Sequence, residues 1–569
     1  MRSLRNPFIT LGLSLLLAGS AMLAQKTGDT TNKVSAEGKL AVLIEGLGKY
    51  NRPITTPSAV AQRYFDQGLL FVYGYYFSEA LASFQEAARL DPACPMVYWG
   101  MAMAIGPNPN SRYFGFPDDP QGKGREAIQK AWSLRAGASP KEVAFITALL
   151  VRYDREKFPD RKQRDAAYVQ AMKELFTRYP NDPEAGTFYA DSLMTPSPWN
   201  YWNPDGSPRP GMTEAATALE RVMAVRPNHP GANHLYVHLF ENSQTPSRAL
   251  VAADRLGQTV PVAGHIVHMP SHIYIRVGQY DKAIASNERS LAADKENLRL
   301  WGDRAFPSEV TDATSAKTHA MHANEFIRSA ATWEGNFTRA AEAARASAAQ
   351  TAQMVMGSNG PVGSNGPVQH RYVQLWLTYR RFQKWQELLA LPAPANGMPY
   401  VEGTWHFVRG SAFTALGKTQ DAQHELEQLK TLATDPAMAR LMIAVNPASI
   451  VLNLCGEILS GELAAKRGEI ESALSHLERA VRIEDGLAYM EPPDWDHPVR
   501  LNLGAVLLEA KRPAEAEVVY WEDLRRHPEN GWALHGLAQA FRAEGKNEEA
   551  TQTEERFHRA WAQANSKLE

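Results

Sequence analysis

The chain has 569 residues, a formal net charge of −2 and two cysteines, Cys94 and Cys455. Because acidic and basic residues nearly balance, the charge gives no reason to expect a nucleic-acid partner, and we expect none. A chain of this length can be stabilised by its core without a disulfide framework, so we expect both cysteines to be buried free thiols.

The N-terminus has the pattern of a cleavable secretory signal. Two arginines precede an apolar run over residues 8–17, and the small residues Gly19, Ser20 and Ala21 follow it. This predicts a signal peptide over residues 1–21, cleaved after Ala21 or alternatively after Ala24. The run is too short to cross a membrane, and no later run approaches the roughly 18 apolar residues that a spanning helix needs. The sequence therefore predicts a periplasmic or secreted protein without a membrane span.

Repeats begin after a polar lead. Residues 22–58 are rich in Thr, Lys and Gly, and we expect a partly disordered lead with a short helix over residues 40–47. The next stretch is AQRYFDQGLLFVYGYYFSEALASFQEAARLDP. It has small residues at Gly68 and Ala80, where two helices would cross closely, and Pro92 would end the second helix. This matches the tetratricopeptide pattern, a two-helix unit of about 34 residues that stacks on copies of itself.

Further units with this spacing follow along the chain. Ala215, Ala249 and Ala283 take the small-residue place at intervals of 34, and two clear units lie near the C-terminus. The sequence therefore predicts an all-α fold, a right-handed tetratricopeptide-repeat α-solenoid with loop insertions. We expect one array over residues 59–350, a flexible loop over 351–369 around the tandem hexapeptide GSNGPV, and a second array over 370–569. A capping helix is expected over residues 556–564.

The histidines follow the same repeat. Eight of the sixteen lie between His229 and His322, and the intervals from His234 to His268 and from His238 to His272 are both 34 residues. Histidines one helical turn apart can present two imidazoles to one metal ion, and a neighbouring helix can add more. We therefore infer a candidate metal site formed by His234, His238, His265, His268, His272 and His322. A histidine-rich set without thiolate suits a divalent transition metal, namely Zn, Cu or Fe.

The same face has a second interpretation. Histidines offset from the packing stripe would line the concave groove and contact a protein, peptide or small-molecule ligand there. Other ligand-binding candidates are Arg276, Glu241, which could also orient a ligand histidine, and Trp199 and Trp202 on a Pro-rich loop insertion. The loop could instead fold back and bury its aromatics. Pro270 must kink the helix or start it, and a start there would leave His265 and His268 on a lead-in segment.

Several stretches together resemble a family of exported bacterial tetratricopeptide proteins without an established biochemical activity. They are FDQGL, EAARLDP, PGANHLYVHLFE, GHIVHMPSHIYIRVGQY, EPPDWDHPVRLNLGA and HPENGWALHGLAQAFR. The resemblance implies the fold and export, and it implies histidine where this chain has Glu325. We expect an exported scaffold that binds a ligand in its groove, with a metal-binding protein or metalloenzyme as the alternative. Whether the chain is an enzyme stays open.

Overall fold

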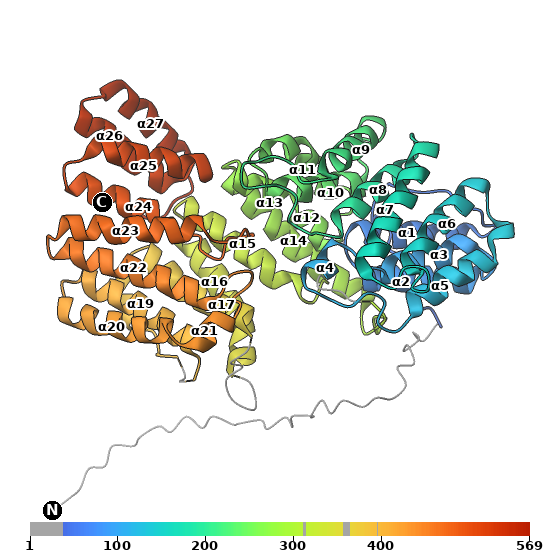
Figure 1. Ribbon diagram of the computed structural model, residues 1–569, viewed down its shortest axis with the longest axis horizontal. Helices are drawn as coiled ribbons and strands as arrows, with labels where there is room; N and C mark the ends of the chain where they lie inside the picture. The colour runs from blue at the N-terminus through green and yellow to red at the C-terminus, as the bar shows by residue number, and fades with distance from the viewer. Residues whose placement is uncertain (1–37, 311–314, 357–364, 395–396, 569) are drawn as a thin grey trace, which may run out of the picture.

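The computed structural model describes residues 38–310, 315–356, 365–394 and 397–568. The predicted signal peptide and the first part of the lead, residues 22–37, lie outside them. Within the described residues the only extended pairings are two isolated bridges, Trp202 with Pro208 and Met442 with Pro447, and no strand is formed. The predicted all-α fold is confirmed, and the chain is a tetratricopeptide-like helical solenoid (Figure 1).

The first half of the solenoid holds two short 3-10 helices, η1 (Arg135–Gly137) and η2 (Pro246–Ala249). Its α-helices are α1 (Ala59–Tyr73), α2 (Phe77–Leu90), α3 (Pro95–Ile105), α4 (Pro109–Tyr113), α5 (Lys123–Ser133), α6 (Pro140–Tyr153), α7 (Arg161–Arg178), α8 (Pro183–Met194), α9 (Met212–Val225), α10 (Pro230–Glu241), α11 (Leu250–Leu256), α12 (Gly264–His268), α13 (Pro270–Arg276), α14 (Tyr280–Trp301), α15 (His319–Trp333) and α16 (Phe337–Met356).

The second half continues with shorter connections. Its helices are α17 (Gly366–Arg381), α18 (Trp385–Leu389), α19 (Pro399–Ala415), α20 (Thr419–Ala433), α21 (Pro436–Arg440), α22 (Ala448–Lys466), α23 (Ile470–Asp485), α24 (Val499–Glu509), α25 (Pro513–Arg526), α26 (Gly531–Glu544) and α27 (Asn547–Ala560). The buried apolar side chains form two clusters, and the boundary between these clusters falls at α16 and α17.

Close helix crossings explain the small residues of the repeat. A Cβ atom at Gly68 would lie 2.7 Å from the Phe84 ring, and one at Gly504 would lie 2.4 Å from Tyr520. Both positions therefore require glycine, because a larger residue would overlap an aromatic ring of the partner helix. Ala80 is fully buried in the same kind of contact.

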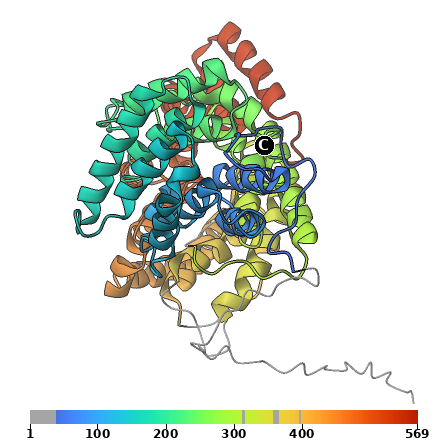
Figure 2. The ribbon, with the colours of Figure 1, turned by 90° about the vertical axis from the view of Figure 1, so that its right-hand side faces the viewer.

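The first array curls until its first unit meets its later helices (Figure 2). The turn between α1 and α2 lies against α10 and α14: the carbonyl of Tyr73 accepts a hydrogen bond from His234, and the Tyr76 hydroxyl donates to Asp294. These pairs are 161 and 218 residues apart in the chain. The curl encloses a polar interior that a straight solenoid would leave open.

The second array returns to the end of the first. The Trp532 indole donates to the Thr332 carbonyl of α15 at 2.9 Å, and the Tyr280 hydroxyl donates to the Pro528 carbonyl at 2.7 Å. Residues 487–495, which we call the covering segment, connect α23 to α24 and reach the interior of the first array. The two arrays therefore meet along α13, α14, α15 and the covering segment.

Three local predictions are wrong. Residues 40–47 form turns rather than a helix, with Gly46 at φ 76°. Residues 556–560 belong to α27, the second helix of the last unit, so no separate capping helix follows. The flexible loop predicted over residues 351–369 is too long, because α16 extends to Met356 and α17 starts at Gly366. Residues 357–364 between these helices lie outside the described part.

Two further features bear on earlier expectations. Both cysteines are free and buried. Among the described helices, α22 is long and apolar enough to cross a membrane, with a mean hydropathy of 1.3. However, 67% of that helix window is buried inside the protein, which is typical of a core helix in a packed solenoid.

Candidate metal centre

Seven histidines lie side by side inside the first array. They are His234 and His238 on α10, His265 and His268 on α12, His272 on α13, and His319 and His322 on α15. Ring centroids of neighbouring members lie 4.7–6.1 Å apart. Six of the seven are buried, and only His322 is partly exposed. We call this set the histidine cluster.

Local sequence signals place the helices that carry it. Pro230 starts α10, and the His229 ring caps it by accepting a hydrogen bond from the Ala232 N–H at 3.0 Å. Pro270 starts α13 rather than kinking a longer helix, which is favourable because a first-turn residue needs no N–H bond. His265 and His268 therefore lie on the lead-in helix α12, the second of the two arrangements considered above.

Hydrogen bonds at Nδ1 fix three of the rings. His234 Nδ1 donates to the Tyr73 carbonyl at 2.7 Å, and His319 Nδ1 lies 2.9 Å from Asp294 Oδ2. His268 Nδ1 lies 2.6 Å from Asn287 Oδ1, and the Asn287 amide donates to Ala283, so its oxygen faces the ring. With Nδ1 donating outward, the Nε2 lone pair points inward, as in histidines that ligate metals.

Glu241 holds two more rings with one carboxylate. Its Oε1 lies 3.0 Å from His238 Nδ1, and its Oε2 lies 2.7 Å from His272 Nδ1. The Trp199 indole also donates to Oε1. Glu491 of the covering segment places Oε2 at 2.6 Å from the same His272 nitrogen. A fully buried carboxylate therefore orients one histidine on α10 and one on α13.

The nitrogen atoms that could hold a metal ion gather in two groups of histidines, and a third group joins His272 to the carboxylates of Glu241 and Glu491. His234, His238 and His265 form one trio and His268, His272 and His322 another, and within each trio the donor atoms lie within 4.8 Å of one another. Two pairs of Nε2 atoms are close, at 3.1 Å between His234 and His265 and at 2.7 Å between His268 and His272. Nε2 of His238 and of His319 meets no hydrogen-bonding group among the described residues.

Burial and mutual repulsion favour the neutral form of three of these rings. Burial, followed by the neighbouring histidines, lowers the pKa of His234, His265 and His268 well below its usual range. Burial opposes the charged form of His272 as well, but the Glu241 and Glu491 carboxylates outweigh it and raise its pKa to about 10. Neutral imidazole is the form that binds a metal ion, and three of the buried rings already hold it.

Tyr75 covers one side of the cluster. Its ring stacks on His238 and His265, with centroids at 5.7 and 5.4 Å, and lies 4.5 Å from His234. Its backbone has a φ of 58°, a region that non-glycine residues seldom adopt, so the surrounding contacts must stabilise it. Such outliers are common beside functional sites.

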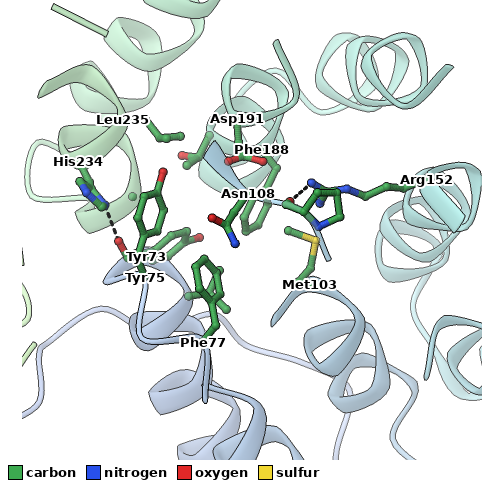
Figure 3. A pocket seen from close by; sticks show the side chains of 14 residues that line it. Tyr73, Tyr75, Phe77, Met103, Asn108, Arg152, Phe188, Asp191, His234 and Leu235 are labelled. Carbon is green, nitrogen blue, oxygen red and sulfur yellow. Dashed lines mark hydrogen bonds between the residues drawn. The ribbon is translucent and has the colours of Figure 1, made fainter. Parts of the chain in front are cut away.

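A small cavity adjoins His234 on this side. Its volume is about 30 Å³, and His234 and Arg152 approach it from opposite sides (Figure 3). The hydroxyl groups of Tyr75 and Thr187 have no hydrogen-bond partner among the described residues. The cavity has room for a few water molecules at most.

A much larger groove lies between the arrays. It measures about 550 Å³ and is lined by the covering segment together with residues of α13, α23, α24 and α25. Glu491 and Arg276 both lie in its wall. Glu491 thus connects the groove to His272.

The predicted site residues have different outcomes. All six predicted metal ligands belong to the histidine cluster, and His319 joins them. The histidines do not line an open concave groove as expected, because Tyr75, α15 and the covering segment bury them. The Glu241 carboxylate contacts His238 and His272. The Arg276 guanidinium donates a hydrogen bond to the Glu241 carbonyl at 2.9 Å and so supports the end of α10.

The aromatic loop insertion folds back onto α10. The Trp202 indole donates to the Leu239 carbonyl at 2.7 Å, and Trp199 lies 5.4 Å from the His238 ring. The two tryptophans therefore brace α10 and Glu241, and Trp199 contacts the cluster directly.

Sequence reasoning missed four contributors: Tyr75, Asn287, Asp294 and Glu491. Asn287 and Asp294 are seven residues apart on α14, so one helix face presents two polar side chains towards the interior. That spacing was a usable signal. Tyr75 and Glu491 lie 163 and 253 residues from His238. The curl of the first array brings Tyr75 to the cluster, and the return of the second array brings Glu491.

Comparison with known proteins identifies no family. No family model matches the chain, and no curated protein matches it. Among solved structures, it is similar to the human IFIT1 dimer with m7Gppp-AAAA, at 12% identity and a TM-score of 0.28, covering 89% of this chain and 90% of that one. It is also similar to Ypp1, at 8% identity and a TM-score of 0.39, covering 88% and 81%.

One expectation is corrected by these structures. Human IFIT1, one of these similar structures, was solved with m7Gppp-AAAA and with PPP-AAAA. This finding contradicts our expectation, made from the net charge, that the chain has no nucleic-acid partner. A near-neutral net charge is not a sufficient reason to exclude one. At such low TM-scores the likeness carries no further conclusion about this chain.

Proposed function

We propose that this protein binds transition-metal ions through the histidine cluster. One observation carries the proposal: the rings of His234, His268 and His319 are held through Nδ1, and ring nitrogens of the cluster lie within 4.8 Å of one another in two trios. A cluster whose only role was packing would have no need to hold its rings by Nδ1 and to gather the nitrogens in this way. A donor set of imidazole nitrogen with nearby carboxylates suits Zn, Cu or Fe.

The absence of sulfur from the described donor sets narrows the chemistry. Cys94 and Cys455 belong to none of the described groups that could hold an ion. Without thiolate, Cu(I) and iron–sulfur clusters are disfavoured relative to Zn(II), Cu(II) or non-haem Fe(II). Whether the bound ion is structural or catalytic follows from its access to substrate.

Metal analysis of the purified protein tests the proposal. After dialysis against Zn²⁺ and removal of loosely bound ions, the wild type should retain zinc in stoichiometric amount. The double variant His238→Ala with His272→Ala should lose it, because it removes the two rings that Glu241 orients. The control His406→Ala with His476→Ala changes two histidines of the second array and should retain the zinc. A wild type without stoichiometric metal contradicts the proposal.

Thermal unfolding provides an independent test of metal binding. An ion that binds only the folded chain stabilises it by about 2.7 kcal/mol at a free concentration of 100 times its Kd. Added Zn²⁺ should therefore raise the Tm of the wild type and leave the double variant unchanged. If both proteins shift equally, zinc binds elsewhere.

A second candidate is a scaffold role for an exported protein. The groove of about 550 Å³ between the arrays is large enough for a peptide segment or a small molecule, and Tyr489 and Trp495 lie in its wall. Selection of random displayed peptides on the purified protein tests this role. Selected peptides should lose binding to the Tyr489→Ala variant, and binding that survives the change contradicts a role for the groove.

A further inference from the structure

We propose that the histidine cluster is a two-ion centre with an enclosed inner ion and an exchangeable outer ion. The inner ion is held by His234, His238 and His265, which we call the inner trio. The outer ion is held by His268, His272 and His322, the outer trio, and lies beside Glu491 of the groove wall. This inference rests on the proposed metal-binding function and adds the number of ions and their access.

Two separate donor sets support two ions. The trios share no residue, and each already supplies three nitrogen atoms within 4.8 Å of one another. Three protein nitrogens are the common minimum for a tightly held zinc-like ion, so neither trio needs a ligand from the other. His319 lies between the trios, with ring centroids 5.6 Å from His265 and 4.9 Å from His268. Its Nε2 atom points inward and can serve as a further metal ligand for either trio.

Glu241 links the two trios, and with His272 and Glu491 it also forms a third group that could hold an ion. One carboxylate oxygen contacts His238 of the inner trio, and the other contacts His272 of the outer trio. A histidine that ligates through Nε2 is commonly oriented by such a carboxylate at Nδ1. A single buried carboxylate that serves two ligand histidines fits two neighbouring ions, whose combined positive charge would offset its own.

The inner trio is enclosed. His234, His238 and His265 are 1%, 2% and 5% exposed, and the Tyr75 ring lies over all three. The space beside them is the small cavity next to His234. An ion in this position has no broad route to solvent, which is the arrangement of structural metal sites.

The outer trio is open on one side. The His322 side chain is 25% exposed, whereas the His238 side chain of the inner trio is 3% exposed. His272 contacts Glu491, whose covering segment forms part of the groove wall. Sites that exchange ligands keep an accessible coordination position, and the outer trio is the one that offers it.

Metal release to a coloured chelator tests this arrangement. The full-length protein is loaded with Zn²⁺, freed of excess metal and mixed with 4-(2-pyridylazo)resorcinol. Two zinc ions per chain should be released in two phases of equal amplitude, a fast one from the outer trio and a slow one from the inner trio.

Single variants assign the phases. His322→Ala should lose the fast phase and retain one ion, because His322 belongs only to the outer trio and is partly exposed. His265→Gln should lose the slow phase and retain the outer ion. If the His265→Gln protein does not fold, His238→Gln takes its place in the experiment. The control His476→Ala, far from the cluster in sequence, should keep both phases.

Each outcome has a defined meaning. One ion per chain in the wild type, lost in both variants, would show a single shared site: it would overturn the two-ion inference and leave metal binding intact. Loss of the fast phase in the His265 variant would overturn the assignment of inner and outer ions. A wild type without zinc would instead refute the proposed function itself.

Discussion

Glu241→Gln is the most informative single change, because one side chain orients a ligand histidine in each trio. The carboxylate oxygens lie 3.0 Å from His238 Nδ1 and 2.7 Å from His272 Nδ1. Glutamine keeps the size and one acceptor oxygen, but its amide nitrogen cannot accept a hydrogen bond. The histidine that faces the amide therefore loses its Glu241 acceptor, although His272 keeps Glu491 beside it, and both histidines lose the negative charge of Glu241.

The expected magnitude follows from the role of such partners. Loss of an outer hydrogen-bond partner of a ligand histidine typically weakens metal binding by about 10–100-fold. This corresponds to about 1.4–2.8 kcal/mol of binding free energy. Because Glu241 serves both trios, we expect both affinities to fall into this range, while a residue of one trio alone would affect one.

Competition against a chelator of known zinc affinity measures this change. Glu457→Gln is the matched control: Glu457 also contacts a histidine at Nδ1, at 2.7 Å from His476, but it lies in the second array. The control should bind zinc like the wild type. Unchanged zinc affinity in a folded Glu241→Gln protein would refute the role assigned to this carboxylate.

Two further predictions concern stability. Ala516 is fully buried, so Ala516→Leu should overpack the repeat and cost about 1–3 kcal/mol, whereas Ala514→Leu at an exposed site of the same helix should be near neutral. Equal Tm values for the two variants would show that the repeat register is wrong. Burial raises the pKa of Glu79 from 4.5 to about 8. Between pH 4.5 and 8 the folded protein therefore binds a proton that the unfolded chain has lost. The free energy of unfolding should fall as pH rises through this interval. Glu79→Gln should therefore raise the Tm relative to wild type at about pH 8 and have little effect near pH 4.5; a pH-independent difference would contradict this.

The fold was predictable because its signals are local and repeat. Small residues such as Gly68 and Ala80 mark helix crossings within one unit, and the interval of 34 residues repeats them along the chain. Helix starts were equally clear at Pro140 and Pro183, where proline follows a capping Ser or Asp. These features act over a few residues, so one sequence is sufficient to read them.

The setting of the histidines was not predictable in the same way. Repeat alignment placed His234 and His268 at equivalent positions, but it could not show that the array curls and buries them. Burial of the cluster depends on Tyr75, which precedes these histidines in the chain by more than 150 residues, and on Glu491, which follows them by a similar distance. A periodic pattern reports which face a residue occupies within its own unit, whereas closure of a superhelix depends on small rotations summed over many units.

The position of bound metal is the most direct test of the central claim. Crystals grown with Zn²⁺ and measured on both sides of the zinc absorption edge should show two anomalous peaks, each about 2.0–2.1 Å from histidine Nε2 atoms of one trio. One peak should lie beside His234, His238 and His265, and the other beside His268, His272 and His322. An absence of peaks in the cluster, with zinc found only at surface histidines such as His476, would contradict the account.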